Sequence, residues 1–78
     1  MKTPGIEWEN LNAEVISLYK MGQFGRAVVV AKKALDVAEK AVGANHPSVA
    51  QSLNHLAELY GAQGQYAQAE PLYKRSLA

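Results

Sequence analysis

The residues that could carry out chemistry are few in this sequence, and their spacing supports little beyond hydrogen bonding. Ser52 and His55 lie three residues apart, on one face of a helix, but no third residue completes a set of nucleophile, base and orienting group. His55 also has no carboxylate or cysteine partner at the spacing of metal ligands. Cysteine is absent, and so is a glycine-rich phosphate loop. We therefore expect no catalytic residue, no metal, no cofactor and no enzymatic activity.

Charge and hydropathy exclude two further classes of partner. The 78 residues carry eight Lys and Arg against seven Asp and Glu, a formal net charge of +1, which argues against binding nucleic acid by neutralising phosphates. The three lysines of segment 32–40 flank its two acidic residues and form no basic stripe. The longest apolar run, residues 27–31, is far too short for a membrane span. Without cysteine or an apolar signal segment, we expect a cytoplasmic protein with no nucleic-acid or membrane partner.

Four helices are predicted to hold the remaining polar side chains in place. Apolar residues recur every three or four positions over about residues 4–21, 24–42, 48–60 and 66–78, as on one face of a helix. Turns rich in glycine or proline separate these segments. Thr3 is the expected N-cap of the first helix. Ser48 has capping-box spacing to Gln51 at the start of the third helix, and Pro47 prevents that helix from starting earlier unless Pro47 is itself a first-turn residue. The sequence is therefore predicted to be all-α.

Two local features weigh against a purely helical interpretation. Val28-Val29-Val30 is β-branched and could form a buried strand. The alanine-rich, charge-spaced continuation through Lys40 favours a helix instead. Pro71 lies inside the fourth segment, where it removes the hydrogen bond to the carbonyl of Ala67 and is expected to bend the helix.

A tandem repeat organises the four segments. Gly22-Gln23-Phe24-Gly25-Arg26-Ala27 corresponds to Gly64-Gln65-Tyr66-Ala67-Gln68-Ala69, which follows 42 residues later, and Leu35 recurs as Leu77 at the same offset. Self-similarity at a fixed period is the sequence signature of a repeat architecture. The repeated unit is predicted to be two antiparallel helices joined by a short glycine turn.

The second unit carries a recognisable pattern of small and large apolar residues. Its key positions are Leu53, Leu56, Ala57, Tyr60, Gly64, Tyr66, Ala69 and Tyr73. This pattern resembles the tetratricopeptide repeat, in which small residues let the two helices approach closely and aromatic residues fill the space beside them. The first unit departs from the pattern at Glu14, where an apolar residue is expected, and at Ala31, which replaces a large aromatic residue.

The period of 42 residues indicates a longer type of this repeat, because the common tetratricopeptide repeat has about 34 residues. The loop 43–47 and the segment Glu70-Pro71-Leu72-Tyr73 are similar to the kinesin-light-chain type of tetratricopeptide repeat. His46 then looks like a turn residue of that family rather than a ligand. The resemblance implies an all-α fold of antiparallel helix hairpins stacked as a right-handed superhelix, with four helices in about two repeats. We expect one domain over 1–78, with repeat 1 over about 6–47 and repeat 2, truncated, over about 48–78.

In this family the first helix of each pair lines the concave face, and that geometry selects candidate binding residues. Asn12 and Asn54 correspond at the offset of 42 residues, and an asparagine amide can hold an extended peptide backbone through one donor and one acceptor. Either asparagine could equally be an ordinary solvated surface residue. The family's clamp for a terminal carboxylate needs lysine at these two positions, so a receptor for chaperone tails is disfavoured. The candidate partner-binding residues are Glu9, Asn12, Ile16, Tyr19, Gln51, Asn54, His55 and Glu58.

Three classes of function remain open at this point. The favoured one is a non-catalytic scaffold that binds an extended protein or peptide segment on the concave face. The second is a structural unit that stacks or forms a homo-oligomer without a peptide ligand, through the uncapped C-terminal helix with Leu72 and Leu77. The third is a repeat segment that serves a catalytic domain elsewhere in a longer chain.

Overall fold

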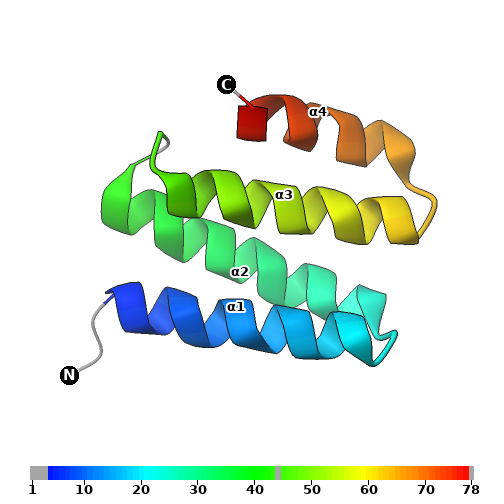
Figure 1. Cartoon of the computed structure of the whole chain (residues 1–78), viewed down its shortest axis with the longest axis horizontal. Helices are drawn as coiled ribbons and strands as arrows, with labels where there is room; N and C mark the ends of the chain where they lie inside the picture. The colour runs from blue at the N-terminus through cyan, green and yellow to red at the C-terminus, as the bar shows by residue number, and fades with distance from the viewer. Residues whose placement is uncertain (1–3, 44, 78) are drawn as a thin grey trace.

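The computed structural model describes residues 4–43 and 45–77, and α-helix is its only regular secondary structure there. The helices are α1 (Pro4–Lys20), α2 (Phe24–Val42), α3 (Pro47–Ala62) and α4 (Tyr66–Leu77) (Figure 1). Val28-Val29-Val30 lies inside α2, and no β-strand occurs among the described residues. The prediction of an all-α fold with four helices is confirmed.

Both hairpins turn through the same backbone motif. Gly22 and Gly64 have φ angles of 74° and 76°, a left-handed conformation that glycine adopts without a steric penalty. In the first hairpin the Gln23 N–H donates to the Leu18 carbonyl at 2.9 Å, and in the second the Gln65 N–H donates to the Tyr60 carbonyl at 2.8 Å. These are the long-range bonds of a Schellman motif, which satisfies carbonyls left unpaired at a helix end. The predicted positions of the two hairpin turns are therefore confirmed.

The third helix begins differently from the sequence-based expectation. Ser48 is not its N-cap: α3 starts at Pro47, His46 is the N-cap, and the Nδ1 atom of His46 accepts a hydrogen bond from the Ser48 N–H at 3.1 Å. Proline suits the first helical position because it has no N–H that would remain unpaired there. The helix also continues to Ala62, and the N-cap expected at Thr3 lies outside the described residues.

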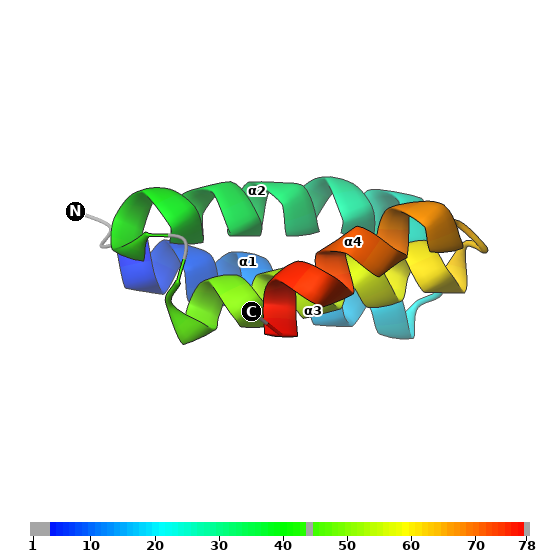
Figure 2. The same ribbon diagram turned by 90° about the horizontal axis from the view of Figure 1, so that it is seen from above.

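The helices pack in chain order, α1 on α2, α2 on α3 and α3 on α4. Figure 2 shows α2 on one side of the molecule and α3 on the other, and Figure 1 shows α1 and α3 running in the same direction. α2 contributes small side chains to the core, because Ala27, Ala31, Ala34 and Ala38 are all buried. These alanines let α2 lie close to the larger residues of its neighbours, chiefly Val15, Leu18, Val49, Leu53, Leu56 and Leu59.

Two polar contacts between helices tie the hairpins together. The indole Nε1 of Trp8 on α1 donates to the hydroxyl of buried Ser52 on α3 at 2.7 Å. On another side, the Arg75 guanidinium of α4 donates to the Glu39 carboxylate of α2 at 3.1 Å. Each contact joins one helix of the first hairpin to one helix of the second, so both restrict how the hairpins can slide past each other.

Candidate functional site

A hollow of about 200 Å³ opens between α1 and α3. These two helices are the first members of their hairpins, so the hollow lies on the face that the repeat pattern assigned to partner binding. Its lining comes from both helices and is formed by Val15, Ile16, Tyr19, Lys20, His55, Glu58 and Leu59.

The floor and the wall of the hollow are apolar. Val15 and Leu59 belong to the core and are 3% and 1% exposed, so they form a fixed, dehydrated floor. Ile16 and Tyr19 stand beside them on α1 and are 40% and 45% exposed. Large apolar side chains that remain this accessible are typical of a surface that binds another molecule.

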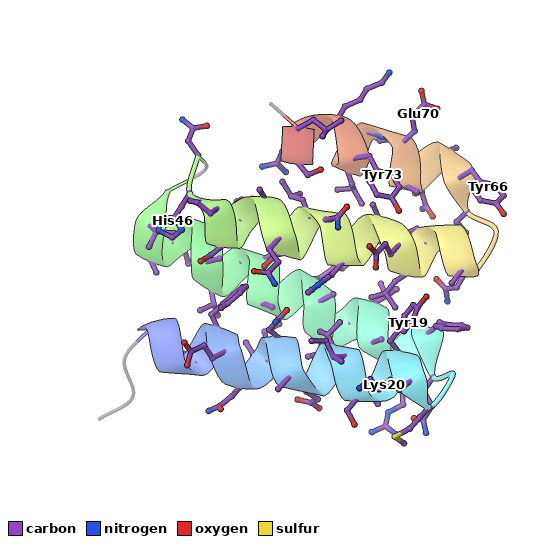
Figure 3. The ribbon with its side chains drawn as sticks, in the orientation of Figure 1. Tyr19, Lys20, His46, Tyr66, Glu70 and Tyr73 are labelled. Atoms are coloured by element: carbon purple, nitrogen blue, oxygen red, sulfur yellow. The ribbon has the colours of Figure 1, made fainter. Side chains whose placement is uncertain are left out.

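The ring of Tyr19 makes an aromatic contact with the ring of Phe24. Tyr19 and Phe24 lie with their ring centroids 5.4 Å apart and their planes at 61°, an edge-to-face arrangement. Phe24 is the first residue of α2, directly after the hairpin turn. Figure 3 shows Tyr19 between α1 and α3 at the end of the molecule near that turn. The turn therefore helps to orient the wall of the hollow before any partner arrives.

The rim of the hollow carries opposite charges on the two helices. Lys20 is the last residue of α1, and Glu58 lies on α3. The Asn54 Nδ2 atom donates to the Glu58 Oε1 atom at 3.2 Å, which uses one of the two N–H groups of that amide. His55 on α3 is a further lining residue of the hollow and is half-buried. A ligand in the hollow would thus meet an apolar surface with a cation on one helix and a carboxylate on the other.

The opposite end of the α1/α3 seam is closed by the hydrogen bond between Trp8 and Ser52. A buried hydroxyl without a partner is costly, and the indole N–H supplies that partner. Because Ser52 is 2% exposed and bonded to Trp8, it is not available to act with His55 as a nucleophile and base. The serine–histidine spacing is therefore a structural feature of α3.

The structure brings together half of the residues selected from the sequence. Ile16 and Tyr19 from α1 and His55 and Glu58 from α3 line the hollow. The other four residues lie on the same two helices but do not line it. Among these, Asn12 and Asn54 are half-buried, whereas Glu9 and Gln51 are exposed.

Sequence reasoning missed three lining residues, Val15, Lys20 and Leu59. Val15 is a core residue, and a core residue can also form the floor of a hollow. Lys20 follows Ile16 by four positions, which puts both on the same side of a helix, so this spacing could have identified it. Only the packing of α3 against α1 could have added Leu59.

A second, wider hollow of about 410 Å³ lies on α1 and α2 and is lined by charged groups. The Lys40 ammonium is 3.0 Å from the Asp36 carboxylate, one helical turn away, and both side chains are largely exposed. This agrees with the mixed-sign, solvated face expected for α2. Its full lining is Glu7, Lys33, Asp36, Val37, Lys40 and Ala41.

No group of three or more His, Cys, Asp or Glu side chains is placed to hold a metal ion in residues 4–43 and 45–77. In the same part of the chain, no helix is both long enough and apolar enough to cross a membrane.

Comparison with known proteins identifies the repeat. Residues 10–78 match the family model of the tetratricopeptide repeat. Over 59 residues the chain is 40% identical to nephrocystin-3 of Xenopus laevis, 41% to that of Homo sapiens and 46% to that of Mus musculus. Each alignment covers 76% of this chain but only 4% of the relative, so the chain spans a small part of the length of these proteins.

Proposed function

We propose, because this chain belongs to the tetratricopeptide repeat family, that its α1/α3 face binds an extended segment of another protein. Domains built from this repeat are generally non-catalytic protein–protein interaction modules. The observation that carries the proposal is the hollow between α1 and α3, which combines a buried apolar floor with a polar rim. Surfaces with an apolar centre and a polar edge are the usual anatomy of a recognition site.

The two asparagines supply the means to hold a backbone. Asn12 lies eight residues before Lys20, the last residue of α1, and Asn54 lies eight residues before Ala62, the last residue of α3. Both residues are half-buried, which limits the side-chain entropy that binding would remove. We propose that they contact the main chain of the partner segment, with Glu9 and Gln51 as further contacts toward the other end of the helices.

The experiment uses a display library of random short peptides selected on the immobilised chain. Selected peptides are expected to bind the wild type and to lose about tenfold in affinity when Asn12→Ala and Asn54→Ala are combined, since each amide hydrogen bond contributes about 0.5–1.5 kcal/mol. Gln68→Ala, which removes an exposed amide on α4, is the matched control and should leave affinity unchanged. Failure to select any peptide, or equal affinity for the double variant, contradicts the proposal.

A structural assembly unit is the second candidate, and the surface of α4 favours it. Tyr66 and Leu77 are 71% and 86% exposed, and Tyr73 on the same helix is also exposed. Figure 3 shows Tyr66 and Tyr73 along α4, away from the α1/α3 hollow. Light scattering across micromolar concentrations distinguishes the candidates. A concentration-dependent oligomer that Leu77→Lys abolishes supports assembly, whereas a monomer at all concentrations rules it out.

A further inference from the structure

The hollow between α1 and α3 has the size of one side chain. Its volume of about 200 Å³ is somewhat larger than the roughly 150 Å³ of an apolar protein cavity that accommodates benzene. A single leucine, isoleucine, methionine or phenylalanine side chain would therefore occupy it. Alanine or glycine would leave the exposed faces of Ile16 and Tyr19 in contact with water, and the gain from burying apolar surface would be lost.

The hollow is also prepared for such a side chain before binding. Its floor, Val15 and Leu59, is fixed by the core, and the Tyr19 ring is oriented by Phe24. A site whose walls are already ordered loses little conformational entropy when a ligand enters. The exposed faces of Ile16 and Tyr19 would then be buried by the incoming group.

The charges at the rim are not equivalent. The Glu58 carboxylate already accepts a hydrogen bond from Asn54. Lys20 forms no ion pair with another residue in the described part of the chain. An ammonium beside an apolar pocket gains most from a ligand carboxylate, because the pocket excludes part of the water that would screen the pair. The rim therefore favours an acidic neighbour at the Lys20 side.

Resting on the proposed function, we infer that the partner segment carries one large apolar residue next to an acidic residue. The apolar side chain inserts beside Ile16 and Tyr19, and the acidic side chain pairs with Lys20. The asparagines hold the main chain without regard to sequence, so the hollow and its lysine supply the sequence preference of the site.

The first test uses the peptides selected on the wild type. One position is expected to be enriched in leucine, isoleucine, methionine or phenylalanine, and its change to alanine should weaken binding to the wild type about tenfold to a hundredfold. On Ile16→Ala the same peptide change should cost several-fold less, because part of the contact is already missing. Val29→Ala, at a 68% exposed position of α2, is the control. On this variant the peptide change should weaken binding as much as it does on the wild type.

The second test reverses the charge at the rim. Selection on Lys20→Glu should replace the preference for an acidic neighbour by a preference for a basic one. Lys32→Glu, at an exposed position of α2 outside the hollow, is the control and should keep the acidic preference. An unchanged preference on Lys20→Glu would overturn the assignment of the lysine.

The outcomes separate the two levels of the proposal. Two outcomes overturn the pocket assignment and leave the binding face intact. In the first, peptides need Asn12 and Asn54 for binding but show no enriched apolar position. In the second, changing the apolar peptide residue to alanine costs the same affinity on the wild type and on Ile16→Ala. Peptides that do not depend on the asparagines, or no peptides at all, overturn the binding face and the pocket assignment with it.

Discussion

α1 and α3 hold the same place in their hairpins but have different surroundings. α3 lies between the first hairpin and α4, and it buries Val49 and Leu56. The residues 42 positions earlier, Glu7 and Glu14, are charged, and Glu14 is exposed. Exposed Asn10 and Ser17 likewise correspond to buried Ser52 and Leu59. On the face that packs in both hairpins the apolar character is kept, because Leu53 corresponds to Leu11.

The difference explains why the first unit departs from the repeat pattern at Glu14. An apolar residue is needed at that position only where another hairpin packs against the helix, as the first hairpin does against Leu56. No helix of the described residues covers Glu14, so a carboxylate remains solvated there without cost. Polar outer faces of this kind are what terminal repeats need in a stacked array.

A second difference separates α2 from α4. Ala31 is 2% exposed where α3 lies close to α2, whereas Tyr73, 42 residues later on α4, is exposed. A large side chain at position 31 would keep α3 away from α2. The replacement of an aromatic residue by alanine in the first unit therefore accompanies the close packing of the second hairpin.

The largest difference in the free energy of unfolding is expected between variants at the corresponding positions 14 of α1 and 56 of α3. Leu56→Ala should lower the free energy of unfolding by about 2–5 kcal/mol, because it leaves a cavity in the core. Glu14→Ala, at the corresponding position of α1, should change it by less than about 0.5 kcal/mol. Urea unfolding followed by far-UV circular dichroism measures both. Comparable losses would show that the two helices are not differently surrounded.

The two turns should respond alike, because they have the same geometry. Gly22→Ala and Gly64→Ala are each expected to cost about 1–2 kcal/mol, since a side chain is strained at positive φ although no atom lies within 4 Å of the added Cβ. Gly61→Ala, inside α3 and also without a neighbour within 4 Å, should instead stabilise the protein by about 0.5–1 kcal/mol. Thermal unfolding of the three variants checks this, and a large difference between the turns contradicts it.

The contact between α1 and α3 should depend on the hydrogen bond between Trp8 and Ser52. Trp8→Phe removes the indole donor and leaves the buried Ser52 hydroxyl unpaired, with an expected loss of about 1–3 kcal/mol. Adding Ser52→Ala to Trp8→Phe should restore part of that loss, because the unpaired hydroxyl is gone. Urea unfolding of the two single variants and the double variant measures the coupling. Strict additivity would mean that the bond is not formed.

The smallest effect is expected for the ion pair between the hairpins. Arg75→Gln should cost about 0.2–1 kcal/mol, since the arginine and Glu39 side chains are 51% and 37% exposed and water screens the pair. The loss should shrink as salt is raised. Lys74→Gln, which breaks an i, i+4 pair with Glu70 inside α4, is the control with no link between hairpins. Denaturation at low and high salt compares the two.

Much of the fold was available from local sequence signals. The turns at Gly22 and Gly64 were located because glycine adopts positive φ readily and the residues after it repeat. The start of α3 was misplaced because two capping signals competed within three residues. Ser48 offered a capping box, but Pro47 fits the first helical position and the His46 side chain caps it.

The candidate site was available only in outline. Helical spacing selected Ile16, Tyr19 and Glu58, and these three line the hollow together with the further candidate His55. The same spacing also selected Asn12 and Asn54, whose role in binding stays a prediction. It could not select Leu59, because that residue lines the hollow only through the packing of α3 beside α1.

The sequence by itself determined four helices, two glycine turns and a duplicated hairpin, because helix periodicity, turn chemistry and repetition are properties of neighbouring residues. Tertiary structure alone decided that Trp8 reaches Ser52, that Leu59 forms the floor of a hollow and that Glu14 stays in water. These three features depend on contacts between residues that lie dozens of positions apart in the sequence. No local pattern encodes these contacts, because they depend on how closely the two hairpins pack. The small side chains of α2 set that packing.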